Sequence, residues 1–303
     1  MTTLTRPFTP LAHRGPRSAE RVVPLPTVSA VHHALLRPGA RLVDALDEAV
    51  TAAGATSGQV ELLDGTLATV SYCFPGEGRP GGPLVGYCPA REATGPVRVV
   101  GGSATVGRRA GARFIHCHAA WFDAEGDLAG GHLWPETHVG PAGLHAVVHA
   151  LRDVELTSAD DPESGLPVFT PERRHRGGEA ASSGPSAPGA QTRPAVMVRV
   201  CAGENLLEVC AAIMEDHGMA EASISGSLGS LVGAALARPA GLLVVDGPAT
   251  EVTLSGRLRL AGGALTHHLP AIVIDRHGRV HTGLLTDQNI VAVTVELLVE
   301  GLR

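Results

Sequence analysis

Three histidines in the middle of the chain have the spacing of a metal site. His116 and His118 are two residues apart, so on a β-strand both side chains point to the same face. A turn follows, in which Gly126 occupies the left-handed position that a short hairpin loop requires. If the turn closes a hairpin, His132 lies directly opposite His118. Three neutral imidazoles with an open fourth position are the ligands of a catalytic zinc site, although iron, manganese or nickel also fit such a site.

An ordinary structural role is the alternative for these histidines. The chain contains 15 histidines, so some clustering arises by chance. A single histidine on a strand usually makes a plain polar contact. The same-face pair with a third histidine across a hairpin keeps the metal hypothesis open beside this alternative.

Glu136 is the candidate for proton transfer beside the three histidines. It shares strand parity with His132, as does His138, so on an unbroken strand both would lie on the same face. Pro135 lies between them and can break that register. Arginines near the site would bind a carboxylate substrate through bidentate contacts, with solvated surface as the alternative for each. Four arginines are candidates: Arg98, Arg108, Arg109 and Arg113.

Composition excludes several function classes. The 303 residues include 44% hydrophobic and 18% charged residues, enough to bury a core in about two domains. All 24 basic residues are arginine, so Schiff-base lysine chemistry and a phosphate-binding P-loop are excluded. The net charge of −6 argues against a broad nucleic-acid surface.

Cysteine usage and hydropathy point to a reduced compartment. The five cysteines form no CxxC pair, so neither a disulfide framework nor a thiolate zinc site is indicated. The sequence shows no apolar run of signal-peptide length at its start and none long enough to span a membrane. We therefore expect a cytoplasmic protein without a membrane partner.

Composition also divides the chain into segments. Residues 1–27 are rich in proline and arginine and are predicted to be a flexible lead-in. Residues 170–194 are rich in Gly, Ser, Pro and Ala and are predicted to be a disordered linker. Two globular domains remain, at 28–169 and 195–303.

The two domains look like copies of one another. When they are aligned at one constant offset, Gly39 meets Gly203 and Gly54 meets Gly218, each pair flanking a helical pattern. Each helix precedes an alternating segment that predicts a strand, and further apolar or alternating runs follow, many separated by Gly/Asp turns. One helix with mostly hairpin-connected strands predicts an α+β domain on a largely antiparallel sheet.

The second copy lacks the histidine pattern. Aligning Gly278 with Gly126 places His268 at the position of His116, but Pro270 and Leu284 at the positions of His118 and His132. The second domain is therefore not expected to bind metal in the same way.

These features together resemble the plant-and-prokaryote-conserved (PPC or PCC) domain family, in two tandem copies of which the second is degenerate. The segments of the first copy that carry the resemblance are Arg37-Pro38-Gly39, the strand 58–67, His116-Cys-His118, Asp123-Ala-Glu-Gly126, Gly130-Gly-His132-Leu and the acidic tail 154–166. The resemblance implies a compact α+β domain, trimeric assembly among bacterial members, and a metal, often zinc, on the three histidines. Plant members accompany AT-hooks, but the nearest match here, Glu77-Gly78-Arg79-Pro80, has an acid in place of the first arginine.

Two functions are compatible with these observations. The first is a metal-dependent enzyme, a lyase or hydrolase with zinc as the expected cofactor, acting on a small carboxylate-bearing molecule. The second is a non-catalytic ligand-binding or oligomerisation module with a structural metal or none. A catalytic metal predicts an open coordination position beside a polar pocket, whereas a structural one predicts four protein ligands.

Overall fold

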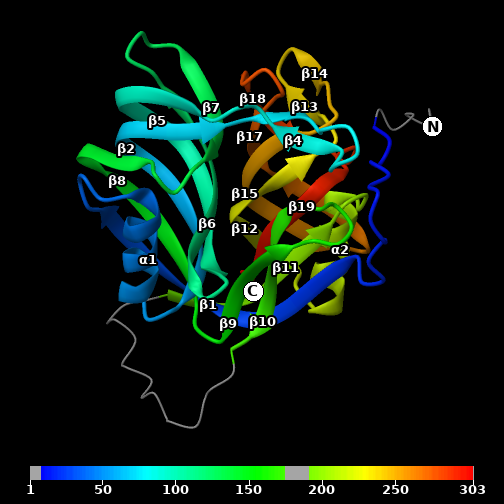
Figure 1. Cartoon of the computed structure of the whole chain (residues 1–303). Helices are drawn as coiled ribbons and strands as arrows, with labels where there is room; N and C mark the ends of the chain where they lie inside the picture. The colour runs from blue at the N-terminus through cyan, green and yellow to red at the C-terminus, as the bar shows by residue number, and fades with distance from the viewer. Residues whose placement is uncertain (1–7, 175–190, 303) are drawn as a thin grey trace.

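The computed structural model describes residues 8–174 and 191–302. Two α+β domains follow each other along the chain (Figure 1). The first contains β1 (Val22–Leu36), α1 (Leu42–Ala52), β2 (Ser57–Cys73), β3 (Pro75–Glu77), β4 (Val85–Tyr87), β5 (Arg91–Arg109), β6 (Ala112–Phe122), β7 (Leu128–Leu133), β8 (His138–Leu151), β9 (Val154–Asp160) and β10 (Pro167–Arg173). The second contains β11 (Gln191–Cys201), α2 (Leu206–Asp216), β12 (Glu221–Leu231), β13 (Ala234–Arg238), β14 (Gly241–Val245), β15 (Thr250–Ala261), β16 (Ala264–His268), β17 (Pro270–Ile274), β18 (Val280–Leu285) and β19 (Val291–Gly301).

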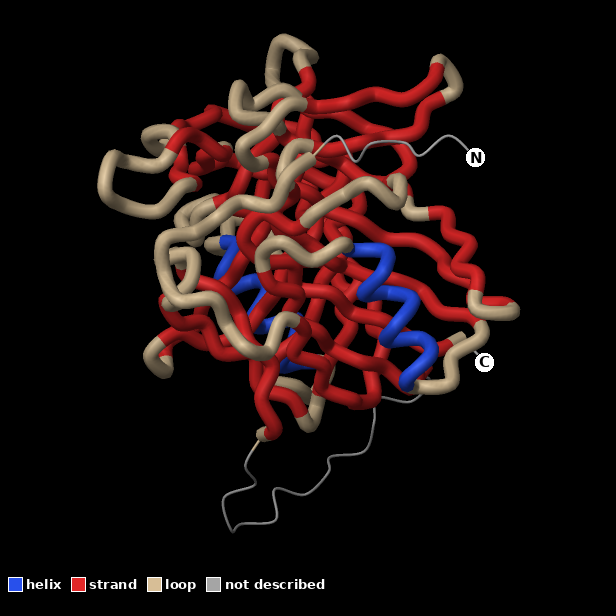
Figure 2. Tube along the Cα trace, turned by 90° about the vertical axis from the view of Figure 1, so that its right-hand side faces the viewer, coloured by secondary structure: helices blue, strands red, loops and turns tan. Residues whose placement is uncertain are grey.

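Each domain packs its helix on a largely antiparallel sheet, as the sequence predicts. The helices lie apart from one another, each beside strands (Figure 2). The apolar stripe of α1, including Leu42, Leu46 and Val50, is buried in the first core. The Asn205 side chain caps the start of α2 by accepting hydrogen bonds from two main-chain N–H groups. Neither of these helices is long and apolar enough to cross a membrane.

The structure confirms the repeat. The helices begin at Leu42 and Leu206, which are separated by the same offset as the paired glycines, and β2 and β12 keep that offset. β6 corresponds to β16 and β17, and β7 to β18, at a smaller offset. The two offsets differ because the first domain carries an insertion.

That insertion follows β2. The end of β2 pairs with β7 and with the start of β5, just as β13 pairs with β18 and β14 in the second domain. By these pairings Cys73 is equivalent to Ala237 and Arg91 to Leu243, so residues 74–90 of the first domain correspond to only 238–242 of the second. The extra residues contain the β3–β4 hairpin. We call residues 74–90 the cap.

Equivalent strands join the two domains. β1 and β11 run antiparallel, and their register pairs Ser29 with Arg193, which is its equivalent in the second copy. A strand pair in which a residue faces its own equivalent has a local twofold axis. β1 also pairs with β8, and β11 with β19, so one sheet continues through both domains.

The ends of the domains differ from the sequence prediction. Residues 22–27 lie in β1, not in a flexible lead-in, because they pair with β11. Further upstream, Phe8 and Leu11 pack against a core cluster of both domains. β10 and β11 extend into both ends of the predicted linker 170–194, and residues 175–190 lie outside the described part of the chain.

Candidate metal centre

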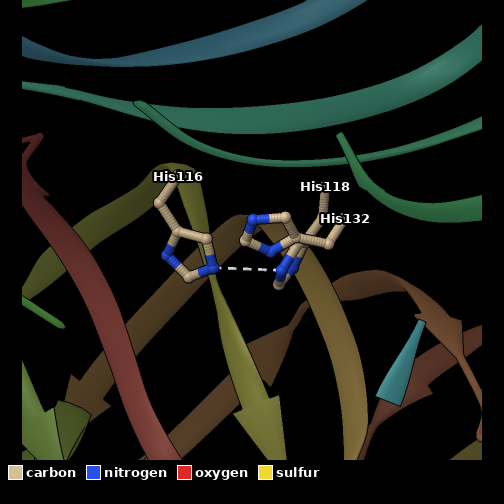
Figure 3. Close-up of side chains that lie close together, drawn as sticks. All are labelled: His116, His118 and His132. Atoms are coloured by element: carbon tan, nitrogen blue, oxygen red, sulfur yellow. Dashed lines mark hydrogen bonds between the residues drawn. The ribbon is translucent and has the colours of Figure 1, made fainter. Parts of the chain in front are cut away.

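The three histidines meet at the interface between the domains. β6 and β7 form the predicted hairpin, in which Asp123 N–H donates to the Asp127 carbonyl and His118 faces His132 directly. One ring nitrogen of each histidine lies within 4.8 Å of those of the other two, and His116 Nε2 is 3.0 Å from His118 Nε2. Two nitrogens bound at 2.0–2.1 Å to a tetrahedral ion stand about 3.3 Å apart. Figure 3 shows the three rings converging above the strands of the second domain.

The second domain orients two of the rings. His116 Nδ1 is 2.6 Å from Glu296 Oε2, and His118 Nδ1 is 3.2 Å from the Val252 carbonyl oxygen. An N–H on each Nδ1 would donate to these oxygens, which leaves both Nε2 atoms unprotonated and turned toward each other. A carboxylate or carbonyl behind a histidine is the usual outer support of a metal ligand.

Glu251 on β15 lies beside two of the three rings. Its Oε1 is 3.5 Å from His118 Nε2 and 3.7 Å from His132 Nδ1, and the side chain is only 2% exposed. Neither carboxylate oxygen accepts a hydrogen bond from a side chain of the described residues, and the donor beside the carboxylate is the main-chain N–H of His132. Burial raises the pKa of Glu251 well above its ordinary value. A buried carboxylate is costly in its charged form, so it either takes up a proton or is accompanied by a cation.

Burial also keeps His118 and His132 neutral. It lowers the pKa of His132 to about 3 and that of His118 well below its ordinary value, with His116 contributing in both cases. Neutral imidazole is the form that binds a metal, because the lone pair must be free. Three imidazoles and one carboxylate therefore fit a divalent cation such as Zn²⁺.

A small enclosed cavity adjoins the triad. Its volume is about 90 Å³, and its lining is mostly apolar. The cap contributes Tyr87, whose ring centroid is 5.3 Å from that of His132, and Trp134 lies 5.2 Å from the same ring. From the second domain, Ser230 and Thr294 reach the lining. The cavity has room only for a small molecule.

The structure does not bring Glu136 to the triad. Pro135 ends the strand, and Glu136 is exposed in the turn between β7 and β8, outside the cavity lining. His138 is likewise absent from the lining, because it begins β8 and pairs with Thr69. Strand parity fails here because the chain turns directly after Trp134.

The four candidate arginines also lie elsewhere. Each makes an ion pair within the first domain and none lines the cavity: Arg98 with Asp64, Arg108 with Asp47, Arg109 with Asp160, and Arg113 with Asp44 and Asp47. Their structural positions support the alternative of a surface role.

At the positions equivalent to the three histidines, the second domain has the residues that the sequence alignment predicts. Pro270 faces Leu284 across β17 and β18, just as His118 faces His132 across β6 and β7. His268 is exposed on β16 at the position of His116. Within residues 8–174 and 191–302, only the first-domain triad forms a cluster of metal-ligand side chains.

Sequence reasoning missed Glu251 and Glu296. Both are acidic residues inside strands whose neighbours are almost all buried, and this contrast is the available signal. It marks them as unusual without indicating that they meet histidines from the other domain, far away in the sequence.

Comparison with known proteins gives the following matches. The sequence profile of the Plants and Prokaryotes Conserved (PCC) domain matches residues 188–302. No curated protein matches the chain. Among solved structures, a plant- and prokaryote-conserved protein from Pyrococcus horikoshii is 17% identical and covers 48% of this chain and 94% of its own, with a TM-score of 0.38.

Two further structures match to a similar extent. A proposed DNA-binding protein from Ralstonia eutropha JMP134 is 20% identical over 46% of this chain and 89% of its own, with a TM-score of 0.38. A metal-containing protein from Archaeoglobus fulgidus is 20% identical over 46% of this chain and 92% of its own, with a TM-score of 0.36. Each of these proteins corresponds in length to about half of the chain.

Proposed function

Because the PCC profile matches residues 188–302, we propose that the protein pairs a PCC-like second domain with a metal-binding first domain to build one divalent-cation site between them. His116, His118 and His132 would hold the ion, and zinc is the expected metal for this donor set. The observation that carries the proposal is the carboxylate of Glu251, which is 2% exposed, has no side-chain hydrogen-bond donor among the described residues, and lies 3.5 Å from His118 Nε2.

The residues around the site have separate tasks. Glu296 holds the ring of His116 and the Val252 carbonyl holds the ring of His118, so both rings are fixed before an ion arrives. Glu251 would supply negative charge beside His118 and His132. Tyr87 and Trp134 cover His132 and keep water away from it.

We favour small-molecule chemistry of the lyase or hydrolase class as the use of this site. A bound divalent ion would polarise a carbonyl or carboxylate or activate a water. The adjoining cavity of about 90 Å³ admits only a small substrate. With Glu136 outside the site, Glu251 is the carboxylate placed to hold or release a proton there.

A structural metal is the second candidate function. With Glu251 as a fourth ligand the ion would have a full tetrahedral shell, as in structural zinc sites. It would then fasten the second domain to the first, because Glu251 and the histidines come from different domains.

Metal analysis tests the site itself. We expect about one zinc per chain in the wild type, loss of the metal in His118→Ala, and about 10- to 100-fold weaker binding in Glu251→Gln. The matched control is His268→Ala, which removes the equivalent histidine of the second domain and should retain the metal. A wild-type protein that stays metal-free after reconstitution with zinc would sink the proposal.

Cobalt substitution then separates the two uses. An exchangeable coordination position predicts that thiocyanate alters the visible spectrum of the Co²⁺-loaded protein. A shell closed by Glu251 predicts no change in the wild type and a response in Glu251→Gln. The first result supports catalysis and the second a structural metal.

Nucleic acid is not among the proposed partners. The net charge is −6, and the surface arginines Arg108, Arg109 and Arg113 are paired with aspartates, so these side chains offer no open phosphate-binding face. Trimeric assembly and a cytoplasmic location stay predictions.

A further inference from the structure

A second, larger cavity lies where the second domain lacks the histidines. Its volume is about 990 Å³, and it opens to solvent between β2 and β5 of the first domain and β13, β15, β17 and β18 of the second. His268, Pro270 and Leu284, the equivalents of the triad, all line it. The open cleft therefore lies at the place in the second domain that corresponds to the triad in the first.

The absence of a cap explains the difference in size. In the first domain, residues 74–90 fold over the triad and leave an enclosed space. In the second domain the short segment 238–242 stands in place of the cap, and two of its residues, Arg238 and Pro239, border the cleft instead of covering it.

The cleft combines apolar walls with two free hydroxyl groups. Leu63, Leu254 and Ile272 are among the apolar residues of the lining. Ser103 and Thr253 also line it; they are 3% and 5% exposed. Neither hydroxyl makes a hydrogen bond to another described residue, so both remain available to a ligand.

The charged groups of the cleft favour an anion. Arg238 Nε donates to the Thr282 carbonyl at 2.7 Å, which fixes the guanidinium at the edge of the cleft. No carboxylate of the described residues pairs with it. Glu61 also lines the cleft, but its carboxylate accepts hydrogen bonds from Ser255 and the Gly226 N–H. The guanidinium is therefore the free charge, and its fork suits a carboxylate or sulfonate.

We propose that this cleft binds an organic anion with an apolar body, whose acidic group pairs with Arg238 and whose body packs between the two domains. Cavities of 300–1,000 Å³ with apolar walls and a few polar groups are typical small-molecule sites. The site is independent of the metal centre, because it shares no lining residue with the triad cavity.

Two fluorescent probes test the proposal with the full-length protein. 1-Anilinonaphthalene-8-sulfonate carries an anionic group, and N-phenyl-1-naphthylamine has the same aromatic body without it. We expect saturable binding of the anionic probe at about one site per chain, weakened about tenfold by Arg238→Gln, because a charge-assisted hydrogen bond is lost. The neutral probe should bind Arg238→Gln and the wild type equally.

Two further variants complete the test. Ala237→Trp places a large ring in the cleft from an exposed strand position and should abolish binding of both probes, while thermal unfolding checks that the variant is folded. Arg279→Gln removes an exposed arginine at the other end of the β17–β18 hairpin and should change nothing. Unchanged binding of the anionic probe by Arg238→Gln, or of either probe by Ala237→Trp, would overturn the proposal.

Discussion

His149 and Glu300 occupy equivalent positions in the two repeats and bond to each other across the domain interface, with Nδ1 3.1 Å from Oε1. His149 pairs with Gln59 on β2, and Glu300 pairs with Ser223 on β12, the equivalent of Gln59 in the second copy. Both side chains are buried. Ser29 and Ser225 also donate hydrogen bonds to Glu300.

The His149–Glu300 pair favours contact between a first and a second domain over contact between two identical domains. Two first domains joined by the same strand pairing would place His149 against a second His149, and two second domains would oppose two buried glutamates. Either arrangement would set two buried groups of like charge against each other and lose the His149–Glu300 hydrogen bond, which disfavours it, although Glu61 and Arg193 lie 3.8 Å from His149 and Glu300 within their own domains. The sequence difference at one repeated position therefore favours pairing of the first domain with the second.

Removal of His149 tests this role. Because it removes the hydrogen-bonded charged partner of buried Glu300 and leaves only Arg193, 3.8 Å away, we expect His149→Ala to lower the free energy of unfolding by about 3 kcal/mol, measured by urea denaturation. His145→Ala is the matched control, since His145 is exposed on the same strand, and it should cost less than about 0.5 kcal/mol. Equal losses in the two variants would argue against the interface pair.

The same pair predicts a dependence of stability on pH. Burial opposes the charge on His149, but the hydrogen bond to Glu300 and the negative charges of Glu300 and Glu61 outweigh it and raise the pKa to about 9 from 6.5. The stabilisation is therefore complete below pH 6.5 and is lost as pH rises through 9. The pKa of Glu300 moves the other way: burial would raise it, but the bonds from His149 and the serines lower it to about 2 from 4.5. This part is complete above pH 4.5 and is lost as pH falls through 2.

Urea denaturation of wild type and His149→Gln over pH 5–10 measures the effect. The difference in unfolding free energy between the two proteins should be largest near pH 5–6.5 and should shrink as the pH approaches 9 and beyond. A difference that stays constant over this range would show that the charge on His149 does not contribute.

Restoring the triad in the second domain tests the equivalence of the two sites. Pro270 and Leu284 already face each other in the register of His118 and His132. We expect Pro270→His with Leu284→His, next to the native His268, to raise the zinc content from about one to about two per chain. His268→Ala in that variant should return the content to about one. A restored triad that binds no metal would show that the site also needs a carboxylate from the facing domain, as Glu251 provides in the first.

The cap folds over the three histidines, so we expect a bound metal to exchange slowly. Tyr87 contacts His132 and Trp134, and aromatic contacts of this kind contribute about 0.5–1.5 kcal/mol each. We expect Tyr87→Ala to speed extraction of the metal by a chelator about tenfold, followed by stopped-flow mixing with a coloured zinc indicator. Tyr87→Phe keeps the ring and should exchange at the wild-type rate. Equal rates in all three proteins would mean that the cap does not control access.

The sequence reveals the half of the site that is built locally. His116, His118 and His132 lie within one hairpin, so strand periodicity and a glycine turn are enough to bring them together. The same periodicity predicts the wrong position for Glu136, because the chain turns at Pro135 and the strand does not continue. The local sequence pattern also predicts the two helices and the repeat of the domain.

The other half depends on tertiary contacts. Glu251 and Glu296 reach the triad only because the second domain packs on the first, and no local pattern encodes that packing. Residues 22–27 are likewise fixed by pairing with β11, a strand of the other domain that comes much later in the chain. Their proline-rich composition alone favours a flexible segment.

The pairing of β1 with β11 makes assembly of the site independent of protein concentration. Since it joins the two domains within one chain, the histidines and Glu251 are held together at a fixed effective concentration. A site shared between separate subunits comes apart when the protein is dilute. Here the full donor set would persist in a single molecule, however few copies a cell contains.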